Sequence, residues 1–496
     1  MTGAMNVEAS SRSPVFIGAA LVSAAQTVSE AMQKASDPID LMAQALRRAV
    51  ADTGNPRVLN DVDLVGVVGG LWSYRDPGAL VAQQVGIDPG RTFLTDFGGQ
   101  VPVQFCADIA DKIQRGEIDV AVLLGGECNA TRRALTRGGQ RPAKRDEPAN
   151  SKAEYWGSPL VMGDMSAVER GGDLPRNTYA VLDSALRAEY GETLDEARQR
   201  SARICSTYSN VAATNPHAAT QLAMSADQVG DPSQSNRMVS WPYTKAMCAN
   251  NTVDHAGAII MCSAAGADRL DIDPVKRVYP HLFSLGADTD TLAERFELAD
   301  APGLRATCDS LVNSIGGIDR VAHFDLYCCF PSMVTLTANA LGVDPYRTLT
   351  VTGGLGFAGA PINFAAGEGL IGMIARLRSD PGSLGVVQAN GGHASKHAFG
   401  VFSTSPPPRA LEIISHVPSG PTRPTAGANA SGSAVIDGVT VEYHGHEPFR
   451  AVALVRFDNG ARCWANSDDQ AVMRSVTLTE WVGRAVTVSN GRFAHS

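Results

Sequence analysis

The chain has 496 residues, of which 44% are hydrophobic and 19% charged, so it is long enough for more than one domain with sizeable cores. A formal net charge of −9 without a long basic run excludes nucleic-acid binding as the default function, and no apolar run is long enough to span a bilayer. The 9 cysteines are odd in number and lack the spacing of a disulfide framework, which indicates reduced thiols and a soluble, cytoplasmic α/β protein.

The first predicted element is the apolar run "SPVFIGAALVSAA", residues 13–25. A run of this length with a small-residue end is also found in signal peptides. Only Arg12 stands close before it as a basic residue, and the run continues into an ordinary amphipathic segment. We therefore interpret it as a first β-strand rather than as a signal peptide.

An internal repeat follows, because residues 60–99 are similar to residues 316–354. The matching cores are "VGIDPGRTFLTDFGG" and "LGVDPYRTLTVTGG", and the similarity extends downstream to "VAVLLGGE" and "LGVVQANGG". Each copy is predicted to run strand, helix, strand, helix, strand, ending in Gly-Gly. Apolar runs without alternation, such as "VAVLL" and "LGVVQA", are typical of central strands covered on both faces.

Two such halves would place their Gly-Gly turns in matching positions, with two helix N-termini facing one cleft. Helix N-termini carry unpaired N–H groups and a partial positive charge, so an acyl carbonyl oxygen or a phosphate fits there. Clefts at strand ends are also the usual ligand sites of open α/β sheets. A single glycine more often just closes a turn, but the symmetric pair favours a binding site.

A segment of different character, roughly Ala130 to Trp241, separates the halves. It begins with the polar stretch "RRALTRGGQRPAKRDEPANSK", predicted as a loop, and contains the helical pattern "LDEARQRSARICSTYSNVAATNP", which ends at Asn215-Pro216. A long insertion across a cleft is typical of a lid. Its lysines and arginines either meet an anionic ligand or form a solvated charged surface.

The C-terminal part differs from the rest of the chain in its composition and in its predicted elements. The Pro/Gly/Ser-rich linker "HVPSGPTRPTAGANASGSA" leads to short β-like runs, and Phe457-Asp458-Asn459-Gly460 predicts a hairpin. These features indicate a small all-β barrel of the oligonucleotide/oligosaccharide-binding kind, with an accessory role. His444 and His446 share a strand face, but they lack further ligands, so we predict no metal site.

These features together resemble the thiolase superfamily. The resemblance covers about Pro14 to Ser405 and rests on "WPYTKAMCANNTVDHAGAIIMCSAAGADRL", on "DLYCCFPS", which is similar to the Phe-containing motif, and on "VTGGLGFAGAP", which is similar to the Gly-His-Pro motif. The additional C-terminal domain narrows it to the monomeric thiolase-like proteins of type 1. The resemblance implies a duplicated thiolase-like α/β fold with an N-terminal half (12–129), a loop or lid domain (130–245), a C-terminal half (246–405) and an additional β-barrel domain (421–496).

Active thiolases bind acyl-CoA and make or break a carbon–carbon bond with a nucleophilic cysteine, a histidine and a second cysteine. In this chain the nucleophile position falls on Gly99, the histidine position on Ala360 and the second cysteine position at or near Gln388, while Tyr327 opens the Phe motif. None of the first three can perform the family's chemistry. The resemblance therefore implies that ordinary thiolase turnover is absent.

Several nearby residues are alternative candidates. Cys106 lies on the apolar face of its helix and is predicted to pack. Cys329, with its neighbour Cys328, follows a predicted strand, and His393 and His397 follow the second Gly-Gly. Any of these is a possible substitute nucleophile or base, although packing and loop hydrogen bonds are the more common roles.

The binding architecture remains when the catalytic residues are removed. The resemblance implies that CoA or acyl-CoA is held by the residues Gly98, Gly99, Phe330, Gly353, Gly354, Pro361, Asn390 and Gly391. We expect a CoA or acyl-CoA binder related to lipid metabolism, without a resident cofactor or metal and monomeric rather than dimeric. The alternatives are an active acyltransferase that uses non-standard residues and an interaction module that acts through the C-terminal barrel.

Overall fold

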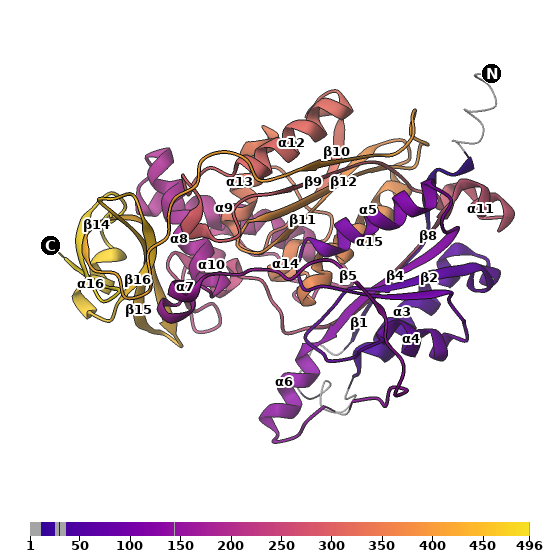
Figure 1. Ribbon diagram of the computed structural model, residues 1–496, viewed down its shortest axis with the longest axis horizontal. Helices are drawn as coiled ribbons and strands as arrows, with labels where there is room; N and C mark the ends of the chain where they lie inside the picture. The colour runs from indigo at the N-terminus through magenta and orange to yellow at the C-terminus, as the bar shows by residue number, and fades with distance from the viewer. Residues whose placement is uncertain (1–10, 25–28, 30–35, 143, 496) are drawn as a thin grey trace.

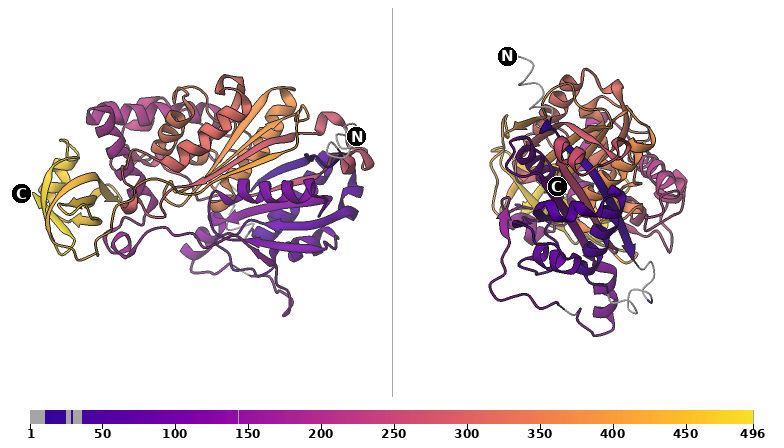
Figure 2. Two further views of the ribbon diagram at one scale, coloured as in Figure 1. Left: turned by 45° about the horizontal axis from the view of Figure 1, so that its top comes forward. Right: turned by 90° about the vertical axis from the view of Figure 1, so that its right-hand side faces the viewer.

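A computed structural model describes residues 11–24, 29, 36–142 and 144–495. Two sheets with a layer of helices between them form the body of the molecule, and the barrel lies at one end (Figure 1). From one outer face to the other, the layers are α12 and α13, the second sheet, α5 and α15, the first sheet, and α3 and α4. The view in Figure 2 shows that the chain narrows between this layered body and the barrel.

The first sheet has the order β1-β8-β4-β2-β3-β5. Its strands are β1 (Pro14–Ala24), β8 (Asp254–Ser263), β4 (Val120–Cys128), β2 (Val62–Val67), β3 (Arg91–Thr95) and β5 (Glu154–Trp156). β8 runs antiparallel to both β1 and β4, whereas β4, β2, β3 and β5 run parallel. The strand predicted near the N-terminus is confirmed as β1. β8, expected to open the second half, instead completes the first sheet because it pairs with β1 and β4.

The second sheet has the order β10-β11-β12-β9-β13. Its strands are β10 (Val321–Asp325), β11 (Leu384–Gly391), β12 (Lys396–Ser403), β9 (Tyr279–Ala287) and β13 (Glu412–His416). β10 and β11 are parallel, and β12 runs antiparallel to both β11 and β9. The set β2, β4, β8 and β1 has the same directions, so the internal repeat is present in the sheet topology.

One predicted strand of the repeat is not formed. The run "RTLTV", expected to match β3, is irregular, and its main-chain contact to the β10 end is a hydrogen bond of 2.8 Å from Leu326 N–H to Leu349 C=O. The buried carboxylate of Asp325 accepts hydrogen bonds from Thr350 Oγ1 at 2.7 Å and from Val351 N–H at 2.9 Å. These side-chain bonds replace the ladder that a third parallel strand would make.

The helices α5 (Val101–Gln114) and α15 (Ala365–Ser379) form the central layer, while α3 (Pro38–Thr53), α4 (Pro77–Val85), α12 (Pro302–Ile315) and α13 (Pro331–Leu341) cover the outer faces. α11 (Ala264–Arg269) follows β8 at the edge. The apolar face of α5 is buried, and the Cys106 sulfur lies 3.7 Å from that of Met261. The packing role predicted for Cys106 is therefore confirmed.

The insertion between the halves contains five helices and a short hairpin among the residues described here. They are α6 (Asn129–Arg137), α7 (Met165–Arg170), α8 (Pro175–Tyr190), α9 (Leu194–Ala212), α10 (Ala226–Gly230), β6 (Met238–Ser240) and β7 (Tyr243–Thr244). The predicted helix is confirmed as α9, whose first turn is closed by a capping box between Thr193 and Glu196. The predicted loop is wrong over its first residues, because Ala134 and Leu135 bury an apolar face and continue α6 to Arg137.

The C-terminal strands close into a barrel of five strands, which confirms that prediction. They are β14 (Gly432–His444), β15 (Glu447–Phe457), β16 (Arg462–Ser467), β18 (Arg492–His495) and β17 (Ala485–Ser489), with α16 (Gln470–Val476) between β16 and β17. The predicted hairpin joins β15 to β16, with Phe457 N–H donating to Ala461 C=O at 2.9 Å.

The barrel is docked on the insertion rather than tethered by a linker alone. Val439 N–H donates to Ser184 Oγ of α8 at 2.8 Å, and a Cβ on Gly438 would lie 2.8 Å from Val181 of the same helix. Glu442 of β14 also pairs with Ser240 of β6, so the barrel sheet continues into the insertion. Helix α8 is therefore packed between the barrel and the layered body.

Within the described part of the chain, no helix combines the length and the hydropathy needed to cross a bilayer. All nine cysteines are free thiols, and eight of them are buried.

Candidate functional site

A cavity of about 750 Å³ opens at the N-terminal end of α5, between the two halves and the insertion. Its volume is in the range of small-molecule and cofactor sites. The predicted ligand-contacting residues that line it are Gly98, Gly99, Phe330, Asn390 and Gly391. Parts of the chain about 290 residues apart thus meet around one space.

The nucleophile position is filled by neighbouring atoms. A Cβ added to Gly99 would lie 2.4 Å from the Asn390 carbonyl oxygen and 2.5 Å from the Tyr327 hydroxyl. Gly99 also has an ordinary backbone conformation, since it is absent from the residues with positive φ. Space, and not backbone strain, therefore excludes a side chain at the position where a thiolase nucleophile would be.

Tyr327 and Gln388 form one buried hydrogen-bonded unit beside the cavity. Tyr327 N–H donates to Gln388 Oε1 at 3.1 Å, and Gln388 Nε2 donates to Thr337 Oγ1 at 2.8 Å. Burial raises the pKa of the Tyr327 phenol, so its hydroxyl is neutral at physiological pH. The Gln388 side chain thus links the segment that follows β10 to helix α13. It does not line the cavity.

Among the proposed substitute residues, Cys329 lines the cavity, whereas His393 and His397 do not. Burial raises the pKa of the Cys329 thiol to about 12, which leaves it protonated at neutral pH. The adjacent Cys328 is also outside the cavity lining, close to Gly354. A buried neutral thiol is a poor nucleophile, so the surroundings of Cys329 give it no activation.

The two histidines are held inside the second half. Burial lowers the pKa of His393 to about 4, so this ring stays neutral, and its Nε2 has no hydrogen-bond partner. His397 is fully buried in β12, with Nε2 2.9 Å from Asp288 Oδ2, and burial lowers its pKa as well. Neither ring reaches the cavity in which a general base would act.

Phe330 and Tyr179 line one wall of the cavity as stacked aromatic rings, and Tyr243, which lies outside the lining, stacks on Phe330. The Phe330 ring stacks on Tyr179 of α8 at a centroid distance of 4.9 Å and on Tyr243 at 5.6 Å. The Tyr179 hydroxyl accepts a hydrogen bond of 2.8 Å from Asn390 Nδ2, while Asn390 Oδ1 is buried without a partner. An unpaired buried acceptor in a cavity wall is suited to receive an N–H or O–H donor from a ligand.

The second Gly-Gly does not line the cavity, contrary to the symmetric arrangement that the repeat suggests. A Cβ on Gly353 would lie 2.4 Å from the Ala212 side chain, and one on Gly354 would lie 2.4 Å from the Tyr208 ring, both in α9. The glycines therefore allow the lid helix to approach. The short helix α14 (Gly354–Phe357) then contributes Leu355, Gly356 and Phe357 to the lining.

The histidine position is likewise remote from the cavity surface. Ala360 is buried, its N–H donates to Asn250 C=O at 3.0 Å, and neither Ala360 nor Pro361 lines the cavity. The next residue, Ile362, does line it and has a φ of 48°, which is rare for a β-branched residue. The turn thus places an apolar side chain, that of Ile362, in the cavity lining, close to the position of the family's histidine.

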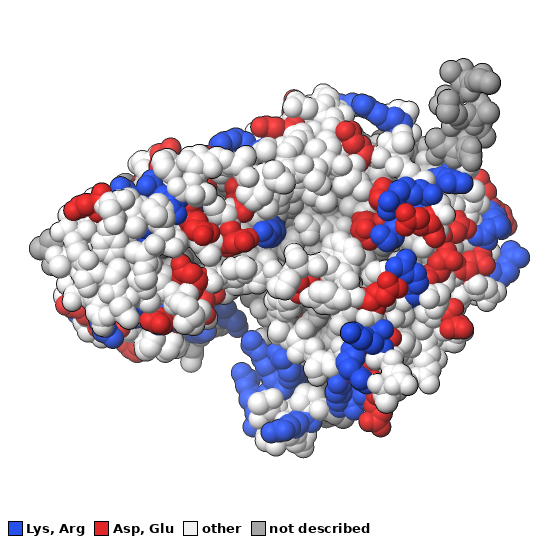
Figure 3. Space-filling model, in the orientation of Figure 1, with Lys and Arg blue, Asp and Glu red and all other residues white. Residues whose placement is uncertain are grey.

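Positive charge gathers on the insertion side of the cavity. The basic residues of the lining are Arg133, Arg176, Arg237 and Lys245, and the described lining includes no Asp or Glu. Figure 3 shows Lys and Arg side chains crowded around α6, which carries Arg133. Arg176 is paired with Glu442 from outside the lining, but no acid within the described lining offsets these cations, which together with the positive end of α5 favour an anionic ligand.

Arg176 of α8 is held in place by the barrel. Its Nη2 lies 2.7 Å from Oε1 of Glu442, whose side chain is almost completely buried. Glu442 also accepts hydrogen bonds from Asn177 at 3.1 Å and from Arg450 at 2.7 Å. A residue of the C-terminal domain therefore fixes the position of an arginine in the cavity wall.

Sequence reasoning missed Tyr179, Arg176 and Glu442. Arg176 and Tyr179 are three residues apart, hence on one helix face, but an amphipathic helix gives no sign of which partner it meets. No group of three or more His, Cys, Asp or Glu side chains in the described part of the chain is placed to hold a metal ion.

Comparison with known proteins agrees with this architecture. Residues 412–492 match the family described as the thiolase-like protein type 1 additional C-terminal domain. The chain is similar to a monomeric SCP2-thiolase like protein type 1 from Mycobacterium smegmatis, with a TM-score of 0.82 and 25% identity over 98% of this chain and 99% of the other. No protein of curated function matches the chain.

Two more distant structures share the fold over most of the chain. An Ltp2–ChsH2(DUF35) aldolase has a TM-score of 0.59 and 18% identity, covering 80% of this chain and 100% of that one. An acetyl-CoA acetyltransferase from Syntrophomonas wolfei has a TM-score of 0.56 and 13% identity, covering 79% and 99%. The resemblance seen in the sequence is confirmed: the chain has a thiolase-like fold, and residues 412–492 match the additional C-terminal domain of type 1.

Proposed function

We propose that this thiolase-like chain binds CoA or an acyl-CoA in the 750 Å³ cavity and does not catalyse the thiolase reaction. The observation that carries the proposal is the lining of the cavity: Gly98 and Gly99 at the α5 N-terminus lie in one space with Phe330 and the four basic residues. A thioester or pantetheine fits the apolar and aromatic part, while phosphates fit the cations.

The absence of turnover is proposed from the catalytic positions. The Gly99 position has no room for a sulfur, because the Tyr327 hydroxyl and the Asn390 carbonyl occupy it. Ala360 and Gln388 carry no group that can abstract a proton from a substrate. The buried acceptor Asn390 Oδ1 is then a binding group for the amide N–H groups of a pantetheine arm.

We also propose that the protein is monomeric, as the Mycobacterium smegmatis relative is described. The outer edge of β3 is covered by β5, with Phe93, Leu94 and Thr95 paired to residues 154–156. The edge of β9 is covered by β13 in the same way. The new edge strands are short, with three residues in β5 and five in β13, and so leave few backbone groups through which sheets of two copies would join. A cytoplasmic location and a role in lipid metabolism remain predictions from the sequence.

The proposal is tested by calorimetric titration of CoA, acetyl-CoA and pantetheine, with a thiolysis assay on the same sample. We expect saturable binding of CoA that weakens as salt rises, weaker binding of pantetheine with little salt dependence, and no thiolysis. Absence of CoA binding at millimolar concentration would overturn the proposal.

Arg176→Ala is the informative variant, and Arg137→Ala is its control. Arg137 is exposed at the end of α6 and does not line the cavity. Loss of a phosphate contact from Arg176 should weaken CoA binding about tenfold, in the range of a charge-assisted hydrogen bond, and leave pantetheine unchanged. Equal affinities for wild type and both variants would place the ligand elsewhere.

The two alternative functions have distinct outcomes in the same experiments. An acyltransferase that uses Cys329 predicts turnover that is lost in Cys329→Ala, against the neutral state of that thiol. If the chain is an interaction module, a protein partner should be captured through the barrel. The barrel face on α8 is already occupied by contacts within the chain, so this alternative needs another face.

A further inference from the structure

Helix α6 and the residues that follow it carry a concentration of positive charge. Residues 129–145 contain six Lys or Arg side chains and no Asp or Glu, in a chain with a formal net charge of −9. Figure 1 shows α6 standing out from the layered body, and Figure 3 shows Lys and Arg covering the same region. The cations are Arg132, Arg133, Arg137, Arg141, Lys144 and Arg145.

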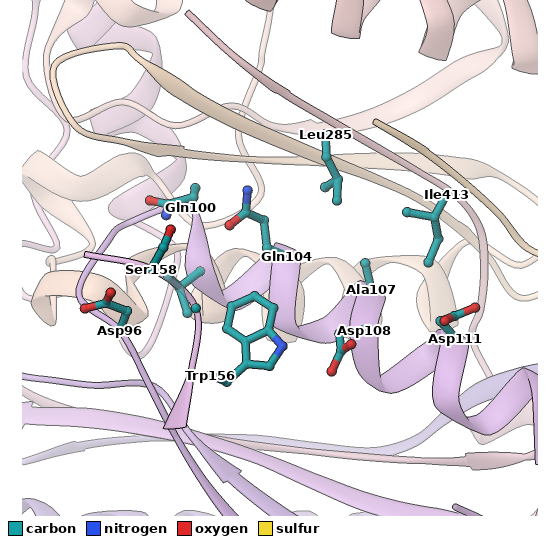
Figure 4. A pocket seen from close by; sticks show the side chains of 12 residues that line it. Asp96, Gln100, Gln104, Ala107, Asp108, Asp111, Trp156, Ser158, Leu285 and Ile413 are labelled. Carbon is teal, nitrogen blue, oxygen red and sulfur yellow. The ribbon is translucent and has the colours of Figure 1, made fainter. Parts of the chain in front are cut away.

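The flank of α5 shows how charges on a helix are neutralised elsewhere in this chain. A second cavity, of about 450 Å³, lies there between α5, the loop after β5 and the second sheet (Figure 4). Its acids are Asp96, Asp108 and Asp111, and no Lys or Arg of the described chain lines it. Asp108 and Asp111 form an acidic stripe on α5, but Asp108 is paired with Lys112 at 2.9 Å and Asp111 with Arg115 at 3.0 Å. This stripe therefore needs no external cation.

The arginines of α6 and the loop after it lack such partners. Arg137 and Arg141 are exposed, and neither has a hydrogen bond or an ion pair within the described part of the chain. Arg132 and Arg133 donate only to uncharged oxygens, a main-chain carbonyl at 3.5 Å and a threonine hydroxyl at 2.6 Å. Like charges close together on a helix repel one another. An anionic surface outside the chain would relieve this repulsion.

An exposed apolar side chain lies directly beside these cations. Leu71, in the loop after β2, is 43% exposed. Its N–H donates to Glu127 Oε1 at 2.5 Å, and its C=O accepts from Arg132 Nη1 at 3.5 Å. Two main-chain contacts thus hold this leucine next to α6 while its side chain faces solvent.

The rim of the 750 Å³ cavity combines the same two kinds of side chain. Phe97 and Leu222 are 38% and 60% exposed, and both line this cavity together with the exposed Arg133 and Lys245. A single exposed apolar side chain is common on protein surfaces. Here such side chains share one cavity opening with cations that continue onto α6. Cations together with exposed Leu and Phe are typical of surfaces that bind anionic membranes.

We propose that α6 and the adjoining cavity rim bind the surface of an anionic lipid bilayer. The arginines contact the acidic headgroups, and Leu71, Phe97 and Leu222 enter the boundary between headgroups and acyl chains. A nucleic acid or a strongly acidic peptide would use the cations alone, whereas a bilayer also accepts the apolar side chains. A bilayer bound in this way faces the opening of the cavity. Its binding does not require CoA and is independent of the function proposed above.

The test is co-sedimentation of the full chain with vesicles of equimolar phosphatidylcholine and phosphatidylglycerol at low ionic strength. Vesicles of phosphatidylcholine alone are the control. We expect saturable binding to the anionic vesicles, weaker binding as the salt concentration rises, and little binding to the neutral vesicles. No binding to the anionic vesicles, or equal binding to both kinds, would overturn the proposal.

Polyglutamate, a soluble polyanion without apolar groups, tests the choice of partner. Added to the anionic vesicles at an equal concentration of negative charge, it should leave most of the protein bound to lipid, because it offers no place for the apolar side chains. If it displaces the protein completely, an acidic chain rather than a bilayer fits this surface, and the proposal is wrong.

Charge variants locate the surface. Arg137→Gln combined with Arg141→Gln removes two charges that lie outside the cavity lining. Each cation near an anionic bilayer contributes a factor of about five in affinity, so this double variant should bind anionic vesicles at least about tenfold more weakly. The matched control is Arg409→Gln combined with Arg474→Gln, two exposed arginines without an ion pair in the described part of the chain. Wild-type binding by both double variants would contradict the proposal.

Leu71→Ser tests the apolar contribution at constant charge. It should weaken binding to anionic vesicles about threefold, while Leu478→Ser, which changes a 68% exposed leucine of the barrel, should have no effect. Unchanged binding by Leu71→Ser would show that charge acts alone and would overturn the insertion of apolar side chains. Thermal unfolding of each variant checks that it is folded.

CoA titration of the same samples separates this proposal from the function proposed above. The variant that lacks the charges of Arg137 and Arg141 should bind CoA like wild type, because neither residue lines the cavity. If wild type binds anionic vesicles but not CoA, only the CoA proposal is wrong. If it binds CoA but not vesicles, only the membrane proposal is wrong.

Discussion

The two cavities meet at the same end of α5 and have opposite charge. The cavity beyond the helix N-terminus is lined by four basic residues and no described acid, whereas the cavity along the flank is lined by three acids and no described cation. Gln100 separates them, since its amide packs between Gly98 and Gly391. The helix itself contributes a positive end to the first and an acidic stripe to the second. The charge of each cavity lining therefore depends on which segments of the chain surround the same helix.

The largest expected effect concerns the thiol in the basic cavity. A pKa of about 12 for Cys329, against 9.0 for an ordinary thiol, reduces the thiolate fraction at pH 8 about a thousandfold. We expect alkylation of Cys329 by iodoacetamide, followed by peptide mass spectrometry, to be slower by about this factor than for an unfolded control. Because the folded pKa is raised, the rate should rise about tenfold per pH unit from pH 7 to 10. A plateau near pH 8 would show an activated thiol and support the acyltransferase alternative.

Gly99→Cys supplies the sulfur that the family pattern has, and we expect it to damage the basic cavity. The new Cβ would meet the Asn390 carbonyl and the Tyr327 hydroxyl, which should cost about 1–3 kcal/mol of unfolding free energy in a denaturant titration. Thiolysis should remain absent. Gly427→Ala is the control, because nothing lies within 4 Å of its Cβ position. Wild-type stability together with turnover in Gly99→Cys would show that the position is open.

Glu442→Gln tests how far ligand binding in the basic cavity depends on the barrel. Without the carboxylate, Arg176 loses its anchor, and we expect CoA affinity to fall about fivefold while pantetheine affinity stays constant. Asp468→Asn, an exposed barrel carboxylate paired with Arg492, is the matched control. A loss of pantetheine affinity as well would indicate that the barrel as a whole has moved.

The same carboxylate gives a pH dependence with a definite sign. Burial acts to raise the pKa of Glu442, but hydrogen bonds from Arg176 and Arg450 overcome it and lower the pKa below the ordinary 4.5. The stability that this group contributes is therefore present above about pH 4.5 and is lost as pH falls through the folded pKa. The difference in unfolding free energy between wild type and Glu442→Gln should therefore decrease as the pH falls below about 4.5.

The smallest effect is expected at the shared wall. Gln100→Ala removes the amide that packs between Gly98 and Gly391 at this wall. CoA affinity should change by less than about twofold, because the side chain does not line the basic cavity. A larger loss of CoA affinity would mean that Gln100 supports the wall of the basic cavity.

Much of the fold was predictable because it depends on local patterns that occur twice. The runs "VAVLL" and "LGVVQA" predicted buried strands, and the repeat predicted matching halves, because strands covered on both faces have no polar alternation. The unformed strand at "RTLTV" was not predictable, since it depends on Asp325, whose carboxylate replaces the ladder bonds. The place of β8 in the first sheet likewise depends on pairing with β1, far away in sequence.

The candidate site was predictable only in part. Gly98, Gly99, Phe330, Asn390 and Gly391, which the family motifs mark, line the cavity, and their contact with CoA stays a prediction. Gly353 and Gly354 were predicted to have the same role as Gly98 and Gly99, but they lie against α9 and leave room for this helix to pack closely. The role of Glu442 was not predictable from the sequence. Its side chain points to the outer face of a barrel strand and is buried only because the barrel docks on α8.

By itself, the sequence determined the thiolase-like plan, the additional barrel, and the absence of a reactive side chain at residue 99. These follow from residue identity and from periodicity, which are properties of the chain read locally. The tertiary structure decided that Tyr327 and the Asn390 carbonyl fill the space at Gly99, that Arg176 depends on Glu442, and that α5 separates a basic cavity from an acidic one. Each of these is a contact between distant segments, and such contacts are fixed by packing rather than by any pattern along the sequence.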